Sequence, residues 1–469
     1  MRSTSPTQSG KLYEETVPAS EKEQEITKAE SLGETGTDEA YNALLHKLDE
    51  AVKKLDTVAL LNNGNSTAED IIEAMQNVAA IQWNVGMLDQ AQELQEEILS
   101  RLIQMHEHHS TTTENDAGAP PQHIDIATTM HTIGSIQSRL NNPHEAKKWF
   151  NASLSMKKDV LSNYAFHYEI GKTLNGLALI KIQLDQEDDE DLDPLEIISR
   201  LEEAENHYIH HGEDTDGEED NEGDAVDMAD HPHVASINEN IAMVYRMVGD
   251  SRMALQRYEE ALRIQKHWAS PQDLSLHGNE HIMNLNIHSG DCLQGMKRFD
   301  EALERYKEAL RLHMLIVRRE SRLKQENENN NEQDDGVEDK SVVQYSRKVE
   351  ATPMEGILRH NMGLMHAHVG RHDLSMEEYQ LALDIKKSFG DTHPEVAVTM
   401  NAIGAMLATK GEGQSALAHF REALYIFRMH SSAVGDEDAD EDVAQTKKNI
   451  ELAEKTLMGQ GGRGGRRRF

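Results

Sequence analysis

The sequence predicts an all-α protein, an α-solenoid (superhelix) of about seven stacked helix pairs. A short phrase recurs along the chain, as "HIDIATTMHTIGSI" at 123–136, "HYEIGKTLNGLALI" at 167–180, "HPHVASINENIAMV" at 231–244 and "HPEVAVTMNAIGAM" at 393–406. Apolar residues within and after each phrase follow the spacing of three and four that marks one face of a helix. Aromatic residues make up only 4% of the 469 residues, which suits stacked helices packed through small and aliphatic side chains.

Each phrase opens a repeat of two antiparallel helices. In the repeat that begins at 231, Ile241 and Ala242 share one face of the first helix. Gly249 then breaks the helix, and Ala254 and Tyr258 form the apolar face of the second one. We therefore expect small residues where the two helices approach closely, with a large side chain filling the space beside them.

These repeats resemble tetratricopeptide repeats, specifically the longer kind of about 42 residues that is typical of kinesin light chains. Repeats of that kind open with a phrase like H-P-x-V-A-x-T-L-N-N-L-A. The resemblance covers most of residues 68–457. One small residue near the start of each second helix marks the repeats, at Ala91, Ala146, Ala204, Ala254, Ala302, Ser375 and Ala416.

The distance between these marker residues varies from 41 to 73, and the excess is polar sequence. We expect mobile polar insertions, two of them strongly acidic, because such segments carry too little apolar surface to fold. The expected insertions are 106–122, 185–194, 212–230 and 320–350. The other expected parts are a disordered tail at 1–37, a closing helix at 38–61, the repeat superhelix at 68–457 with a capping helix at its end (442–457), and a Gly/Arg-rich tail at 458–469.

Composition limits the classes of partner. The formal net charge of −37 argues against broad docking on nucleic acid or on an anionic membrane. No apolar run is long enough to cross a bilayer, and the first residues do not read as a secretion signal. The single cysteine, Cys292, excludes an intramolecular disulfide and fits a reducing compartment. We therefore expect a soluble, cytoplasmic protein with no membrane partner.

No catalytic motif occurs in the sequence, so we predict that the chain is not an enzyme and needs no cofactor. Two histidine clusters have residues that could bind a metal ion. They are His106, His108 and His109, and His207, His210 and His211. Solvated imidazoles at a helix end beside an acidic loop are the preferred interpretation of both. The acidic run lacks the spacing of a calcium loop, and we predict no metal site.

The resemblance implies a binding surface, because the first helices of such repeats line a concave groove. An asparagine near the middle of a first helix can hold peptide main chain, since its carboxamide both donates and accepts hydrogen bonds. The expected groove asparagines are Asn77, Asn175, Asn240, Asn361 and Asn401, with Asn449 as a further candidate and Thr132 and His288 at the corresponding place in two repeats. Alternatively, these asparagines merely bridge adjacent helices.

Basic residues are expected to face the same groove. They are Arg139, Lys172 and Arg246, with His131 and His360 nearby. A mildly basic lining in an acidic protein would favour a peptide that carries carboxylates.

The sequence therefore predicts a non-catalytic scaffold or adaptor that binds partner peptides in its groove. One alternative is an RNA-associated factor that acts through the tail "GQGGRGGRRRF" at 459–469. A further alternative, carried by the resemblance alone, is association with a kinesin-type motor. The heptad pattern at 41–55 covers only about two heptads, which is short for the coil that such a pairing uses.

Overall fold

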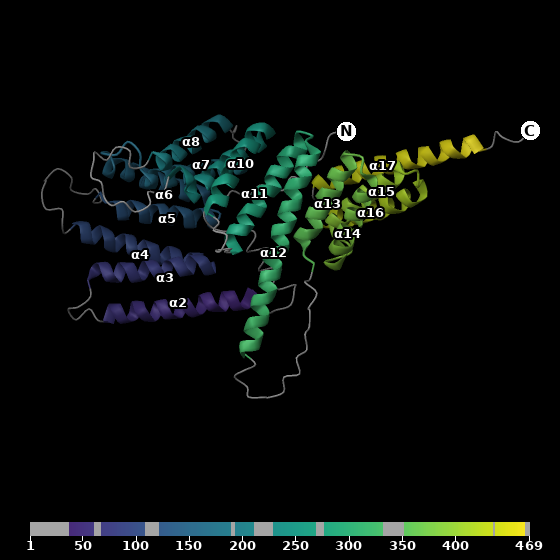
Figure 1. The fold of residues 1–469 in the computed structure, drawn as a ribbon. Helices are drawn as coiled ribbons and strands as arrows, with labels where there is room; N and C mark the ends of the chain where they lie inside the picture. The colour runs from purple at the N-terminus through teal and green to yellow at the C-terminus, as the bar shows by residue number, and fades with distance from the viewer. Residues whose placement is uncertain are drawn as a thin grey trace, which may run out of the picture. The chain divides into compact units, whose positions relative to one another are not determined.

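The computed structural model describes residues 37–60, 67–107, 122–188, 193–210, 228–268, 276–331, 351–434 and 437–464. These residues form helices joined by turns, with no strand among them (Figure 1). The chain divides into two compact units, an N-terminal unit of residues 1–268 and a C-terminal unit of residues 269–469. The all-α prediction is confirmed.

The N-terminal unit contains four helix pairs preceded by α2, which packs on α3. In chain order its elements are α2 (Thr37–Leu60), α3 (Ala68–Val85), α4 (Leu88–Glu107), α5 (Ile124–Arg139), α6 (Pro143–Val160), α7 (Tyr168–Asp188), α8 (Pro194–Ile209), the 3₁₀ turn η1 (Met228–Asp230), α9 (Pro232–Met247) and α10 (Ser251–Trp268). Each helix from α3 to α10 packs on the next one along the chain, which is the stacking expected of helical repeats.

The C-terminal unit contains three helix pairs followed by α17, which packs on α16. Its elements are α11 (Leu276–Gly295), α12 (Phe299–Asn331), α13 (Pro353–His368), α14 (His372–Ser388), α15 (Pro394–Thr409), α16 (Gly413–Val434) and α17 (Glu437–Gly464). Together with the N-terminal unit, the described residues contain the seven helix pairs that the sequence predicts.

The turn inside a pair uses one residue in the left-handed region. In six of the described pairs this residue is Gly86, Asn141, Gly249, Lys297, Gly370 or Gly411, with φ between 59° and 87°. Four of the six are glycine, because a residue without a Cβ enters this region without steric cost. In the seventh pair, α7/α8, the connecting residues 189–192, where the sequence predicts an acidic insertion, lie outside the described residues.

The histidine that opens each of the four recurring phrases caps a helix start. The Nδ1 atoms of His123, His167, His231 and His393 accept hydrogen bonds from the backbone N–H two residues later, each at 3.2 Å. A side-chain acceptor here satisfies an N–H that the helix itself leaves without a partner. Proline follows at the first helical position after His231 and His393, where its fixed φ suits a helix start. The recurring phrase is thus a helix-start signal.

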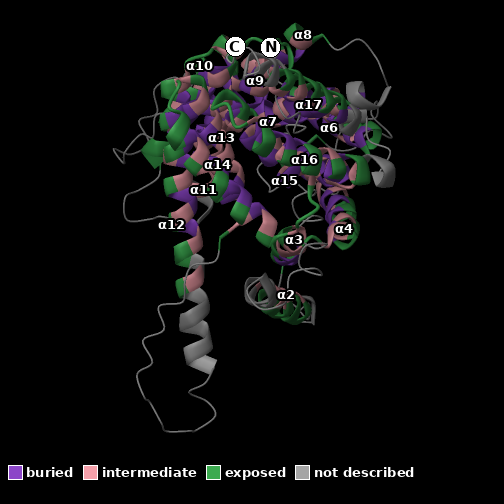
Figure 2. Cartoon of the chain, turned by 90° about the vertical axis from the view of Figure 1, so that its right-hand side faces the viewer, coloured by how far each residue is buried: buried purple, intermediate pink, exposed green. Residues whose placement is uncertain are grey.

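The seven marker residues from Ala91 to Ala416 are all fully buried. At Gly404 a Cβ would lie 2.7 Å from Cε1 of Phe420, so only glycine allows α15 and α16 to approach this closely. The predicted packing of small against large residues is confirmed. In Figure 2 buried and exposed residues alternate along most helices, as expected when one face of each helix packs on its neighbours.

Helices extend into several segments that the sequence assigns to insertions. The helices α7 and α12 run to Asp188 and Asn331, past the expected insertion starts at 185 and 320. Likewise α17 continues to Gly464, into the expected Gly/Arg-rich tail. Residues 106–107 and 228–230 of the expected insertions belong to α4 and η1. The tail at 1–36 and the segments 108–121, 189–192, 211–227, 332–350 and 465–469 lie outside the described residues.

Candidate functional site

An asparagine pair joins two first helices of the N-terminal unit. The Nδ2 of Asn240 on α9 donates to Oδ1 of Asn175 on α7 at 3.1 Å. Asn240 is only 1% exposed, whereas Asn175 is half-buried. Asn240 therefore bridges adjacent repeats, as the alternative interpretation of the sequence proposes. A buried amide that already bonds across a helix junction has less capacity for an outside peptide than an exposed one.

A similar link lies in the C-terminal unit. The Nδ2 of Asn401 on α15 donates to Oγ1 of Thr446 on α17 at 3.1 Å. In return, Oδ1 of Asn401 accepts from Nδ2 of Asn449 at 3.1 Å. Asn361 on α13 is half-buried, and Asn77 on α3 in the other unit is exposed. Peptide binding by these asparagines stays a prediction.

Two of the three predicted basic residues are held by aromatic rings. The guanidinium carbon of Arg139 lies 4.3 Å from the ring centroid of Trp83, and its Nη1 donates to the Trp83 carbonyl at 3.3 Å. This cation–π contact ties α5 to α3. The Nζ of Lys172 lies 5.8 Å from the ring centroid of Tyr168 on the same helix. Arg246 is half-buried in the last turn of α9.

Lys172 borders a buried polar group that we call the Lys157 cluster, formed by Lys157, Glu169, Thr173 and His131. The Nζ of Lys157 donates to Oε2 of Glu169 at 2.7 Å, to the Glu169 carbonyl at 3.1 Å and to Oγ1 of Thr173 at 3.0 Å. Oγ1 of Thr173 lies 3.2 Å from Nδ1 of His131. The cluster joins α5, α6 and α7, and all three donors of the buried ammonium have partners.

The charges in the Lys157 cluster follow from burial and pairing. Burial lowers the pKa of Lys157, and the nearby Glu169 opposes that shift without cancelling it. For Glu169, burial raises the pKa, but the charge and hydrogen bond of Lys157 together with the charge of Lys172 outweigh burial, so the net shift is downward. Burial and the two nearby lysine charges hold the pKa of His131 well below its usual range. At pH 7 the cluster is therefore an ion pair beside a neutral imidazole.

The C-terminal unit repeats this arrangement in the Lys386 cluster, formed by Lys386, Glu395, Thr399 and His360. The Nζ of Lys386 donates to Oε2 of Glu395 at 2.6 Å and to Oγ1 of Thr399 at 3.2 Å. Nδ1 of His360 lies 3.1 Å from the same hydroxyl. Burial, followed by the charge of Lys386, lowers the pKa of His360 to about 3. Here the group joins α13, α14 and α15.

The sequence reasoning missed both clusters, although a signal exists. In "HYEIGKT" and "HPEVAVT" a glutamate and a threonine stand four residues apart, so both face the same side of the helix start. A lysine near the end of the preceding second helix completes the pattern. Lysine is rarely buried without a partner, so a lysine alone would not predict the cluster. The Glu and Thr pair predicts it, because these side chains supply the partners.

The second predicted histidine cluster does not form a metal-binding group among the described residues. His207 is buried, and its Nδ1 accepts a hydrogen bond from the backbone N–H of His167 at 3.1 Å. His211, like His108 and His109 of the other cluster, lies outside the described residues.

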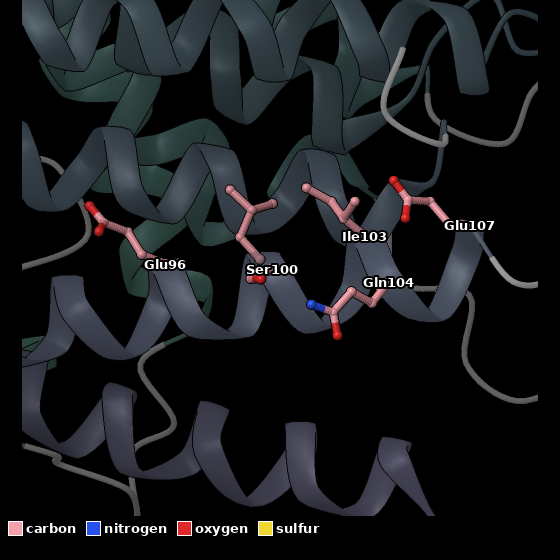
Figure 3. A pocket seen from close by; sticks show the side chains of 6 residues that line it. Glu96, Ser100, Ile103, Gln104 and Glu107 are labelled. Carbon is pink, nitrogen blue, oxygen red and sulfur yellow. The ribbon is translucent and has the colours of Figure 1, made fainter. Parts of the chain in front are cut away.

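A shallow pocket lies on α4 (Figure 3). It is lined by Glu96, Leu99, Ser100, Ile103, Gln104 and Glu107. These residues all belong to one helix, and two of them are carboxylates. The pocket therefore lacks the polar groups converging from several elements that a catalytic site requires.

Over the described residues, none of the helices is both long enough and apolar enough to span a bilayer. The tetratricopeptide repeat family matches the sequence at residues 127–160 and again at 355–429. The first match covers α5 and α6, and the second covers most of the two pairs from α13 to α16. No curated protein matches the sequence.

Solved structures with a similar course of the chain include BtubC (BKLC) from P. vanneervenii, with 15% identity, a TM-score of 0.44, and coverage of 66% of this chain and 99% of the other. Another is a set of nearly identical TPR-like repeats from a proposed kinesin light chain of Podosopora anserina, with 12% identity, a TM-score of 0.37, and coverage of 57% and 99%. The quorum sensor NprR from B. thuringiensis has 13% identity, a TM-score of 0.40, and coverage of 87% and 81%.

Scores this low say nothing about the partners of the chain. The sequence matches are more specific, because they fall on helix pairs in both units and coincide with the observed helices. The same pair, with its left-handed turn and its buried small residue, recurs through the other described helices. Tetratricopeptide repeats therefore occur in both units of the chain.

Proposed function

We propose that the chain is a non-catalytic interaction scaffold that binds extended, acidic segments of partner proteins on the first helices of its N-terminal unit. Tetratricopeptide repeats are protein-interaction modules, and both units contain them. Within the N-terminal unit the first helices are α3, α5, α7 and α9. The predicted basic residues Arg139, Lys172 and Arg246 lie on three of these helices.

One observation carries the proposal, namely that Glu169 is shared by two ammonium groups. Its Oε2 accepts from the buried Lys157 at 2.7 Å, and its Oε1 lies 3.8 Å from Nζ of Lys172. One carboxylate cannot neutralise two cations, so this group carries a net charge of about +1. The side chain of Lys172 is 31% exposed, which places the excess charge where a ligand can reach it.

Nearby imidazoles do not change this balance. Burial lowers the pKa of His233 to about 4, and burial also lowers the pKa of His231. Together with His131 they are uncharged at pH 7. These imidazoles therefore add no positive charge beside Lys172 at pH 7.

Arg139 extends the basic surface to α5. Its contact with the Trp83 ring orients the planar guanidinium, and an oriented guanidinium can pair with a carboxylate through two parallel hydrogen bonds. The exposed Asn77 and the half-buried Asn175 are the asparagines of this unit best placed to hold peptide main chain. In the C-terminal unit the half-buried Asn361 takes this role in the proposal, whereas Asn401, like Asn240, already bonds to a neighbouring helix.

The test is a binding screen of the full chain against a peptide library that contains acidic sequences and matched sequences with Asn and Gln in place of Asp and Glu. We expect selection of acidic peptides, and weakening by about tenfold or more in Lys172→Glu. Lys148→Glu is the matched control, because it makes the same charge change at an exposed lysine on the second helix α6. Equal binding by the two variants would reject the proposed site.

Experiments on the same full chain also test two alternative functions, motor association and RNA contact. Association with a kinesin-type motor predicts capture of a motor subunit from a cytoplasmic extract. RNA contact through the tail predicts crosslinking to RNA that disappears when residues 459–469 are deleted. The expected domain boundaries stay part of the proposal. The cytoplasmic location is also proposed, and imaging of the tagged full chain tests it.

A further inference from the structure

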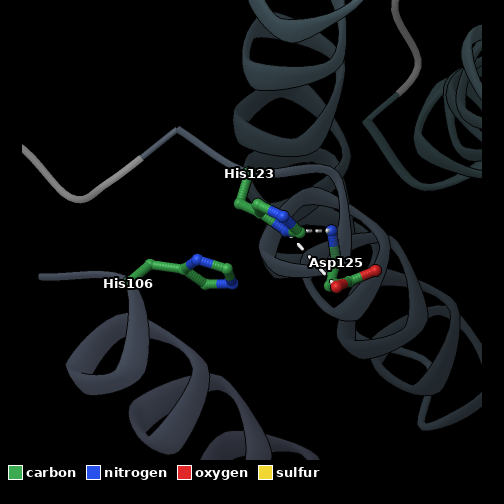
Figure 4. A group of neighbouring side chains, drawn as sticks. All are labelled: His106, His123 and Asp125. Atoms are coloured by element: carbon green, nitrogen blue, oxygen red, sulfur yellow. Dashed lines mark hydrogen bonds and ion pairs between the residues drawn. The ribbon is translucent and has the colours of Figure 1, made fainter. Parts of the chain in front are cut away.

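Three metal-ligating side chains meet where α4 ends and α5 begins (Figure 4). They are His106 in the last turn of α4, the N-cap residue His123, and Asp125 in the first turn of α5. One ligand atom from each residue lies within 4.8 Å of those of the other two. The two imidazole rings are stacked, with centroids 3.8 Å apart and an interplanar angle of 21°.

The distance between two of these groups matches metal coordination. Nδ1 of His123 lies 3.3 Å from Oδ2 of Asp125. Two ligands that each lie about 2.0–2.1 Å from a tetrahedral ion are themselves about 3.3 Å apart. The separation therefore already has the value that a shared Zn²⁺ would impose. The His106 ring stacks on the His123 ring, so its side chain must rotate at the end of α4 to turn a nitrogen toward the same ion.

Comparison with another helix start shows what is special here. His393 and Glu395 form the same N-cap pattern, with Nδ1 of His393 accepting from the N–H of Glu395 at 3.2 Å. Over the described residues, however, only the junction of α4 and α5 brings a second imidazole and a carboxylate together in this way. The N-cap role alone does not require His106, so the third group calls for a different explanation.

We propose that His106, His123 and Asp125 bind one divalent transition-metal ion of the zinc class and so fasten α4 to α5. Two imidazoles and one carboxylate are a ligand set that Zn²⁺ and chemically similar ions accept, and a fourth position is open to water. The ion would replace the N-cap hydrogen bond of His123. Because a cation is disfavoured at a helix N-terminus, the negative charge of Asp125 is an essential part of the site. This proposal replaces the interpretation of His106 as a solvated imidazole.

The experiment measures metal uptake by the full chain. Protein stripped with a chelator and then dialysed against Zn²⁺ or Co²⁺ is analysed for metal content, and the visible absorption of bound Co²⁺ reports tetrahedral coordination. We expect one ion more per chain in the wild type than in His106→Gln, His123→Asn or Asp125→Asn. Affinity for that ion should fall by about tenfold or more in each variant. His123→Asn keeps a side chain that caps helices well, so the loss can be assigned to the imidazole.

The matched control is His393→Asn, which changes the same N-cap residue at a helix start where the described residues supply no third ligand. It should leave the additional ion in place. Circular dichroism of the metal-free variants establishes that they fold. The site is rejected if the wild type takes up no more metal than the three variants, or if His393→Asn lowers uptake as much as His123→Asn does. Because these readouts involve no peptide, they are independent of the proposed function.

Discussion

Lys157 and Lys386 occupy the same position in two repeats, but the carboxylates that they bind differ in exposure. The side chain of Glu169 is 9% exposed, and that of Glu395 is 39% exposed. The contacts to the threonine hydroxyl and to the histidine are otherwise alike in the two clusters. The shared contacts hold three helices together in both units, whereas the exposure of the carboxylate depends on the residues around each cluster.

A second difference lies three residues after the glutamate. This position is Lys172 in the N-terminal unit and Val398 in the C-terminal unit, where the valine packs against the hydrophobic core. Only the Lys157 cluster therefore has a second cation beside its carboxylate. The Lys386 cluster therefore stabilises the packing of its helices. In our proposal the Lys157 cluster does the same and also provides positive charge for a ligand.

The largest expected effect comes from removing each buried lysine. Lys157→Met leaves the carboxylate of Glu169 buried without its strongest partner, which should destabilise the N-terminal unit by about 3–5 kcal/mol. Lys386→Met should cost clearly less, because Glu395 can be hydrated. Urea unfolding gives the free energies, and hydrogen exchange of α6–α7 and α14–α15 shows where the loss occurs.

The double variant Lys157→Met/Glu169→Leu is the control for that experiment. It removes both charges and should recover much of the lost stability, because apolar residues of similar size can replace a buried ion pair. Equal losses for Lys157→Met and Lys386→Met would mean that exposure of the carboxylate does not set the cost.

The next effect is a loss of stability in acid. In the unfolded chain histidine titrates near its ordinary pKa of about 6.5, whereas the pKa of folded His360 is about 3. The unfolded state therefore binds more protons below pH 6.5, so stability is fully present above this pH and falls as the pH drops toward 3. At pH 5 the loss from this residue should be about 2 kcal/mol.

His360→Asn checks this assignment, because asparagine stands at the corresponding position of the next repeat, at Asn401. The variant should weaken the stability change between pH 7 and pH 5, as measured from urea unfolding at each pH. His131→Asn should act in the same direction in the N-terminal unit, where burial also lowers the pKa. A pH profile identical to that of the wild type would contradict the role of these imidazoles.

The helix pairs could be predicted from the sequence because their packing is local and periodic. Gly249 marks a turn and Gly404 a close contact within a stretch of chain short enough to be recognised as a pattern. The bond between Asn240 and Asn175 joins residues 65 positions apart, across an acidic segment of irregular length. Its partner could not be identified before the helices were placed, so the bridging and binding interpretations could not be separated.

The Lys157 cluster was hidden for another reason. Lysine is usually exposed, and the burial of Lys157 depends on three acceptors from the start of the following helix. The proposed metal-binding group at His106 similarly depends on how closely the end of α4 approaches the start of α5. In both cases the residue types were visible in the sequence, but their distances were not.

The smallest predicted effect is a loss of stability that should be equal in the two clusters. Thr173 and Thr399 are both fully buried, and their hydroxyls lie 3.0 Å and 3.2 Å from the respective lysine Nζ. Replacing either by valine keeps the shape of the side chain but removes the hydroxyl contacts to the lysine, to the histidine and to the backbone carbonyl of the glutamate. Because the lysine keeps its carboxylate, the change should cost about 1–2 kcal/mol in urea unfolding. Because carboxylate exposure does not enter this change, Thr173→Val and Thr399→Val should agree even though Lys157→Met and Lys386→Met differ. A large difference between the two threonine variants would show that the clusters differ in more than the exposure of Glu169 and Glu395.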